Sequence, residues 1–125
     1  MNGDENFDAD GREMSRASST TIPTENGSSY LQRLCKHWSH SLEVEFDKEG
    51  GQIRFPRDRR GADWPGDAIA TLSADAKALT IHLEASNEEH RALMEEVLEK
   101  HLQRFAFREG ELVFDWRADG AAGAS

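Results

Sequence analysis

The side chains best suited to chemistry lie close together in residues 34–40, where Cys35, the only cysteine, is followed by His37 and His40. Thiolate and imidazole groups bind transition metals, and they also serve as nucleophiles and bases. A metal needs at least a third ligand beyond a histidine pair, which Glu43 or a residue on a neighbouring strand would have to supply. The segment therefore indicates either a site for iron or another transition metal, or one end of a buried helix.

Helical spacing separates the cysteine from the two histidines. Apolar side chains recur at the spacing of one helical face within residues 28–39, at Leu31, Leu34, Cys35 and Trp38. At about 100° per residue, His37 and His40 lie about 60° apart, whereas Cys35 points about 160° away from His37. One metal cannot bind all three on an intact helix. The favoured interpretation places Cys35 and Trp38 in the core and leaves His37 and His40 at the helix edge, as candidate metal or ligand-binding residues.

A third histidine, His101, lies in the apolar stripe of a second predicted helix over residues 86–105. Val97 and Phe105 lie one turn away on either side, so the imidazole needs a hydrogen-bond partner to offset its desolvation. A hydrogen-bonded core histidine is the favoured interpretation, and a ligand or catalytic base is the alternative. His101 therefore joins His37 and His40 as a candidate ligand-binding residue.

The long polar segment 56–67 contains the other candidates. Its basic residues follow Arg54 and alternate with acids, in a set made of Arg57, Arg59, Arg60, Asp58, Asp63 and Asp67. Guanidinium groups suit carboxylate or phosphate ligands, but a self-neutralising loop is the favoured interpretation. Trp64 indicates either a platform for a ligand or partner, or a lid folded over the edge of the core. Arg57 and Trp64 are the candidate ligand-binding residues of this loop.

Alternating apolar and polar residues predict the strands that must carry these groups. The predicted strands are residues 42–46, 52–55, 69–73, 79–85 and 112–116, and the predicted helices are residues 28–39 and 86–105. Short consecutive strands favour antiparallel pairing, and helices with one apolar face must pack on the sheet. The sequence therefore predicts an α+β fold, an antiparallel sheet of about five strands with two helices packed on one face, in the order α-β-β-β-β-α-β.

The two ends of the chain differ in composition from its middle. Residues 1–19 are acidic and have little apolar surface, which predicts a disordered segment. Residues 118–125 are almost entirely Ala, Gly and Ser, which predicts a flexible tail. Residues 20–117 are then expected to form a single α+β domain.

Overall charge and the remaining motifs restrict the classes of function. A net charge of −9 argues against nucleic-acid and membrane-surface partners, because both attract basic proteins. No apolar run is long enough for a transmembrane helix, no secretory signal begins the chain, and a lone cysteine suits a reducing interior, so we expect a cytoplasmic protein. No nucleotide-binding loop or Ser-His-Asp order is present, so the sequence does not indicate an enzyme.

Three segments together carry a family resemblance. They are Thr24-Glu25 followed by Tyr30-Leu31, then Leu34-Cys35-Lys36-His37-Trp38-Ser39-His40, and finally Arg104-Phe105-Ala106-Phe107-Arg108-Glu109 ahead of Trp116. Over these segments the chain resembles the bacterial domain-of-unknown-function family 2218. Residues 57–67 and the acidic N-terminus depart from the family pattern, so the resemblance implies nothing about binding in that loop.

The resemblance also implies a biological setting. Members of the family often occur beside, or fused to, flavin-dependent siderophore-interacting proteins that reduce ferric siderophores, which implies an accessory role in siderophore-iron use. The leading hypothesis is a non-enzymatic module that binds a ferric siderophore, iron or a partner siderophore-interacting reductase. One alternative is a small metal-dependent enzyme that uses His37 and His40 with a carboxylate and His101. The other is a purely structural or oligomerisation module.

Overall fold

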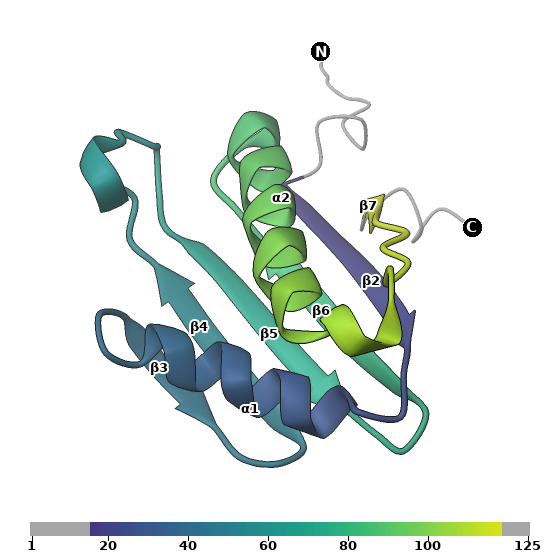
Figure 1. The fold of residues 1–125 in the computed structure, drawn as a ribbon. Helices are drawn as coiled ribbons and strands as arrows, with labels where there is room; N and C mark the ends of the chain where they lie inside the picture. Colours follow the sequence, from purple (N-terminus) through teal and green to yellow (C-terminus); the bar gives the residue numbers. More distant parts are fainter. Residues whose placement is uncertain (1–15, 119–125) are drawn as a thin grey trace.

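The computed structural model describes residues 16–118, which form one antiparallel sheet covered by two helices (Figure 1). The strands are β2 (Ala17–Pro23), β3 (Glu43–Phe46), β4 (Gly50–Phe55), β5 (Ala68–Ala74), β6 (Ala78–Glu84) and β7 (Arg117–Ala118). The helices are α1 (Gly27–Trp38) and α2 (Glu88–Phe105), with short 3-10 helices η2 (Arg59–Gly61) after β4 and η3 (Phe107–Glu109) after α2. The strand order is β3-β4-β5-β6-β2-β7, and all neighbours are antiparallel. The predicted α+β class is confirmed.

The sheet has six strands rather than the predicted five, because β2 lies in its interior between β6 and β7. Two of the inward side chains of β2 are hydroxyls, Ser18 and Thr20, so the strand lacks the apolar alternation on which sequence reasoning depends. Both hydroxyls are hydrogen-bonded. Ser18 Oγ donates to Glu95 Oε2 (2.6 Å), and Thr20 Oγ1 accepts from the Asp115 N–H (3.0 Å). The element order of the described chain therefore begins with a strand, and the first three residues of that strand, 17–19, lie in the segment that was expected to be disordered.

The predicted last strand, residues 112–116, is irregular, and only the two residues of β7 pair with β2. Its alternating apolar side chains are nevertheless half-buried against the core: Leu112, Phe114 and Trp116. Side chains of α2 hold the segment, because the Leu112 N–H donates to Gln103 Oε1 (2.8 Å) and Trp116 Nε1 donates to Glu99 Oε2 (2.6 Å). Alternation here reflects side-chain packing rather than strand pairing.

Helix α1 begins and ends within one residue of its prediction, and its buried face contains the predicted apolar stripe of Leu31, Leu34, Cys35 and Trp38. Two glycines let the sheet approach this helix closely. A Cβ on Gly27 would lie 3.0 Å from the Ala78 carbonyl oxygen, and a Cβ on Gly51 would lie 2.8 Å from Cys35 Sγ. Cys35 is therefore a core residue wedged against β4, as the favoured interpretation holds.

Most of the two predicted flexible ends falls outside the described residues, in 1–15 and 119–125, although Ala118 belongs to β7. Within residues 16–118, neither helix combines the length and the apolar character needed to cross a bilayer.

Candidate functional site

Where α1 meets α2, two of the candidate histidines come together. The ring centroids of His37 and His101 lie 5.1 Å apart, and the ring of Trp38 lies 4.6 Å from that of His101. Phe105 completes the group, with its centroid 6.3 Å from His37. Below them, Trp38 packs edge-on against Phe55 of β4 at 5.0 Å. Two imidazoles thus rest on an aromatic floor that continues into the core.

One ring nitrogen of His101 is hydrogen-bonded to the backbone. Its Nδ1 lies 2.8 Å from the carbonyl oxygen of Val97, one turn earlier in α2. A carbonyl oxygen can only accept a hydrogen bond, so Nδ1 carries the hydrogen and Nε2 of the neutral ring keeps a free lone pair. The prediction that His101 must find a partner is confirmed, but the half-buried ring lies at the margin of the core and touches His37.

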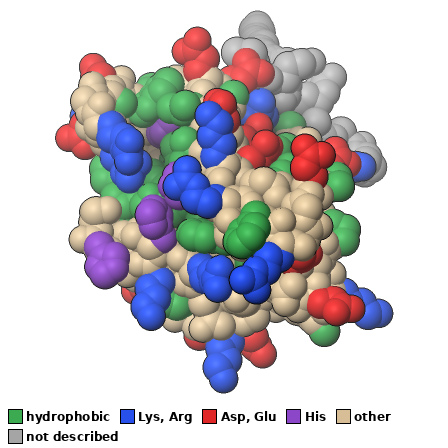
Figure 2. Space-filling model, viewed as in Figure 1, with side chains coloured by type: hydrophobic (Ala, Val, Ile, Leu, Met, Phe, Trp, Pro, Cys, Tyr) green, Lys and Arg blue, Asp and Glu red, His purple; other side chains and the backbone are tan. Residues whose placement is uncertain are grey.

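The neighbouring charges that shift the pKa of His37 are those of basic residues. Its pKa is lowered by partial burial and then by the positive charges of His101, Arg104, His40 and Arg59. Within residues 16–118, neither Arg59 nor Arg104 forms an ion pair. Figure 2 shows basic and histidine side chains gathered over the face that carries the helices, with acidic side chains mainly toward its edges. We call His37, His101 and Arg104 the histidine surface; it is locally cationic although the whole chain carries −9.

The candidate metal-binding pair, His37 and His40, does not lie on one continuous helix in the structure. Helix α1 ends at Trp38, so His40 lies exposed in the following turn and acts on His37 only as a nearby charge. Cys35 is fully buried, and burial raises the pKa of its thiol to about 11, which disfavours the thiolate that a metal would need. No three His, Cys, Asp or Glu side chains between residues 16 and 118 are grouped so that they could hold a metal ion.

A carboxylate that the sequence analysis does not single out joins the start of α1 to the end of α2. Glu109, in η3, accepts hydrogen bonds from Thr24 Oγ1 (3.0 and 2.9 Å), Asn26 Nδ2 (2.8 Å) and the Tyr30 hydroxyl. Hydrogen bonds from Asn26, Tyr30 and Thr24 lower the pKa of Glu109 against the opposing effect of burial. We call these four residues the Glu109 junction. It ties the two helices together on one side of the His37–His101 contact, and its only signal in the sequence is its place within the resembling segments.

The loop candidates, Arg57 and Trp64, are not part of the histidine surface and form their own set of contacts in the loop after β4. The Trp64 ring stacks on the ring of buried His90, with 4.5 Å between the centroids and 5° between the planes. Trp64 therefore occupies the position of a lid over the edge of the core, one of the two interpretations of its sequence context. Arg57 Nε donates to the Trp64 carbonyl oxygen (2.8 Å), and its guanidinium pairs with Asp63 (2.7 Å). Arg54 similarly pairs with Asp67 (3.1 Å), so much of this loop neutralises itself.

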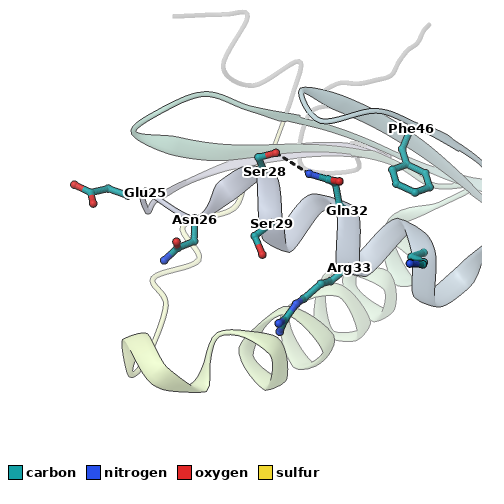
Figure 3. Close-up of a pocket in the computed structure, with 8 residues that line it drawn as sticks. Glu25, Asn26, Ser28, Ser29, Gln32, Arg33 and Phe46 are labelled. Atoms are coloured by element: carbon teal, nitrogen blue, oxygen red, sulfur yellow. Dashed lines mark hydrogen bonds between the residues drawn. The ribbon is translucent and has the colours of Figure 1, made fainter.

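A wide groove lies elsewhere, on the outer side of α1 (Figure 3). It is open, with a volume of about 660 Å³, and Asn26, Ser29 and Arg33 lie along one side of the helix within it. Ser28 and Gln32 are joined by a hydrogen bond of 3.0 Å, and Phe46 enters from β3. None of the candidate residues from the sequence lines this groove, and its polar groups do not converge on one point.

Comparison with known proteins identifies the chain at the level of a family. Residues 19–117 match the model of DUF2218, a family described as an uncharacterised protein conserved in bacteria. The chain belongs to the DUF2218 family. The segments that suggested this family are the ones that meet in space, since residues 34–40 and 104–109 supply His37, Trp38, Arg104 and Phe105, and residues 24–31 complete the Glu109 junction.

A solved structure is similar to this DUF2218 chain. The NMR structure of PA4090 from Pseudomonas aeruginosa is 33% identical in sequence, with a TM-score of 0.62, over 81% of this chain and 94% of that one. This similarity supports the observed α+β fold. No curated protein matches the chain.

Proposed function

We propose that this DUF2218 chain is a non-catalytic module that binds an anionic ferric siderophore on the histidine surface. The observation that carries the proposal is the contact between His37 and His101, 5.1 Å apart and flanked by arginines without acidic partners in the described chain. The siderophore setting comes from the family resemblance, and the basic groups beside His37 support an anionic ligand at this contact.

An anion would reverse the unfavourable charge at this contact. In the free protein, burial and neighbouring cations lower the pKa of His37, so its protonated form is disfavoured. A bound anion would accept charge-assisted hydrogen bonds from Arg104 and from protonated His37, and so raise that pKa. Phe105, which is half-buried beside His37, offers aromatic surface for the organic part of the ligand. Binding is therefore expected to tighten as the pH falls.

A chelate suits this surface better than a bare iron ion. His37 and His101 provide two imidazoles, and no described acidic or sulfur ligand completes a group of three. In a ferric siderophore the chelator already fills the coordination sphere of the iron. The protein then needs only to recognise the outer charge and shape of the complex, which cations on an aromatic floor can do.

The test compares two chelates that differ in charge. Ferric tris-catecholate is trianionic and ferric tris-hydroxamate is neutral, so only the first is expected to bind tightly at low salt. With the diamagnetic gallium tris-catecholate, NMR should show the His37 pKa rising on binding. Equal affinity for both chelates, or no binding of either, would contradict the proposal.

Two charge-matched variants on α2 make the test specific to the site. Arg104→Gln should weaken binding of the tris-catecholate about tenfold, the usual effect of losing one charge-assisted hydrogen bond. Lys100→Gln removes the same charge from a side chain already paired with Glu96 (3.2 Å), so it should change affinity by less than about twofold. Equal losses in both variants would indicate attraction to overall charge rather than to this surface.

A partner reductase is the second candidate ligand, and exposed apolar side chains after α2 favour it. Phe107 and Val113 are 69% and 66% exposed, more than any other large apolar side chain of the described chain. Exposed aromatic groups of this kind often anchor protein partners. Mixing the protein with a siderophore-interacting reductase in analytical ultracentrifugation should give a complex that Phe107→Ser weakens; sedimentation as separate species would contradict this candidate.

A further inference from the structure

A second hollow lies between the loop after β4 and helix α2, beside the histidine surface. Its volume is about 340 Å³, and its apolar lining is Phe55, Trp64, Leu93, Met94 and Val97, together with His90. Phe55 and Met94 are 1% and 6% exposed, whereas Leu93 is 44% exposed. The floor of this hollow is therefore core, while one wall presents a leucine whose surface is still open to solvent.

The wall formed by Trp64, from the loop after β4, is already held in place in the free protein. Trp64 stacks flat on His90, and Arg57 holds the backbone of Trp64 through its carbonyl oxygen (2.8 Å). His90 is fixed in turn, because its Nδ1 accepts the backbone N–H of Ser86 (3.3 Å) and lies 2.8 Å from the Ser86 hydroxyl. A site whose walls are already ordered loses less entropy when a ligand binds.

Two arginines at the mouth lack an acidic partner. Arg59 and Arg60 line the hollow, and neither pairs with a carboxylate in the stretch from 16 to 118, whereas their neighbour Arg57 pairs with Asp63. The guanidinium carbon of Arg59 lies 6.0 Å from the centroid of Phe55, at the edge of the apolar floor. Burial and the charge of Arg60 lower the pKa of Arg59. A partly desolvated cation beside a second cation favours an anionic ligand.

We propose that this hollow binds a small aromatic carboxylate, with the ring against Phe55, Leu93 and Trp64 and the carboxylate on Arg59 and Arg60. Pockets that enclose small ligands span about 300 to 1,000 Å³, so a volume of 340 Å³ suits one ring or a fused pair. Guanidinium groups match the planar geometry of a carboxylate, and a largely apolar hollow can desolvate the pair. The hollow is distinct from the histidine surface, because His37, His101 and Arg104 do not line it, although Arg59 lines the hollow and also acts as a charge on His37.

Three probes with the same ring system test the proposed ligand class. The full chain, labelled with 15N, is titrated with 1-naphthoate, with neutral 1-naphthylmethanol and with cationic 1-naphthylmethylammonium. Naphthoate should shift the NMR signals of the Trp64 indole N–H and the Leu93 amide. The neutral and cationic probes should bind at least about tenfold more weakly, as expected when a charge-assisted pair is lost. Equal binding of the three would overturn the carboxylate assignment. No shift with millimolar naphthoate, or shifts centred on other residues, would overturn the site.

Arg60 offers a variant that separates binding from folding. Its φ of 58° lies in the left-handed region, which glycine adopts without strain, so Arg60→Gly removes the charge and should leave the fold intact. This variant should bind naphthoate about tenfold more weakly. Arg108→Gln, which removes a charge from η3 beyond the far end of α2, should change affinity by less than about twofold. Comparable losses in both variants would overturn the proposal.

His37→Gln distinguishes the two proposed sites. It should weaken the ferric tris-catecholate and leave naphthoate binding unchanged, since His37 does not line the hollow. If His37→Gln abolishes naphthoate binding, naphthoate occupies the histidine surface and the hollow is not its site.

Discussion

The Glu109 junction connects the start of α1 to η3, just after α2, and the histidine surface lies where α1 meets α2, yet the two regions stabilise charge in opposite ways. Glu109 accepts hydrogen bonds from three donors, and those bonds lower its pKa. His37 faces His101 and two arginines, and its pKa is lowered as well. For an acid, a lowered pKa means that the charged form is stabilised, whereas for a base it means that the charged form is disfavoured. The carboxylate of the junction has its hydrogen-bond donors, whereas within residues 16–118 the arginines beside His37 have no acidic partner.

The largest effect is expected where the histidine surface rests on the core. Trp38→Ala removes a side chain that is 3% exposed and packs on Phe55, so the free energy of unfolding should fall by about 3 to 5 kcal/mol. Denaturant unfolding followed by far-UV circular dichroism measures this loss. Phe107→Ala, at a position that is 69% exposed, is the control and should change little. A small loss in Trp38→Ala would mean that the aromatic floor is not part of the core.

The second largest loss of stability is expected at the Glu109 junction. Glu109→Ala leaves the Tyr30 hydroxyl and Thr24 without their acceptor, so the free energy of unfolding should fall by about 2 kcal/mol. Glu111→Ala removes an equal charge two residues further on, from an exposed side chain, and should be nearly neutral. If the two variants lose equal stability, the effect of Glu109 is general electrostatics and the contrast between the two regions fails.

Acid should affect the two regions in separate pH ranges. The pKa values of His37 and His90 are lowered from 6.5, so the unfolded chain takes up protons first and the free energy of unfolding decreases as pH falls below about 6.5. The pKa of Glu109 is lowered from 4.5, so its contribution is present above about 4.5 and is lost as pH falls further.

Unfolding curves across this pH range check both steps. His37→Gln should reduce the first decrease, and Glu109→Ala should reduce the second. A wild-type stability that stays constant between about pH 7 and 5 would contradict the assignment of His37 and His90 as groups that resist protonation in the folded state.

The smallest effect on stability should come from His37 itself. His37→Gln is expected to change the free energy of unfolding by less than about 0.5 kcal/mol near pH 7, because the ring is exposed and uncharged there. At lower pH the variant should become the more stable protein, since the repulsion from His101 and Arg104 is gone. A large loss near neutral pH would make His37 a structural residue like Glu109 and remove the contrast.

Much of this fold could be predicted because its elements bury apolar faces with a clear period. The stripe of α1 and the strands β4 to β6 follow that rule, and they appear close to the expected residues. Strand β2 could not be found in the same way, because its inward-facing residues are the hydroxyls of Ser18 and Thr20. They form hydrogen bonds with residues that are 77 and 95 positions further along the chain, respectively. Polar pairing over such separations leaves no local pattern.

Individual residues of the candidate site could be predicted from the sequence, but their contacts with one another could not. His37 and His101 were singled out separately, and their types and helical positions indicated ligand or core roles. Arg59 was noted only as a member of the basic set in residues 56–67, and Arg104 and Glu109 only within the resembling segments, because a charged residue at a helix end or in a loop is ordinary until its neighbours are known. The same holds for His90, whose stack with Trp64 joins segments that are far apart along the chain.

By itself, the sequence determined the α+β class, the helix that carries residues 34–40, the core position of Cys35 and the family to which the chain belongs. These depend on local periodicity and residue type, which one sequence contains in full. Only the tertiary structure decided that His37 meets His101 rather than His40, that Glu109 completes a junction, and that Arg59 and Arg60 stand at an apolar hollow. Those relations depend on how two helices cross on a sheet, a packing outcome that arises from contacts distant in sequence.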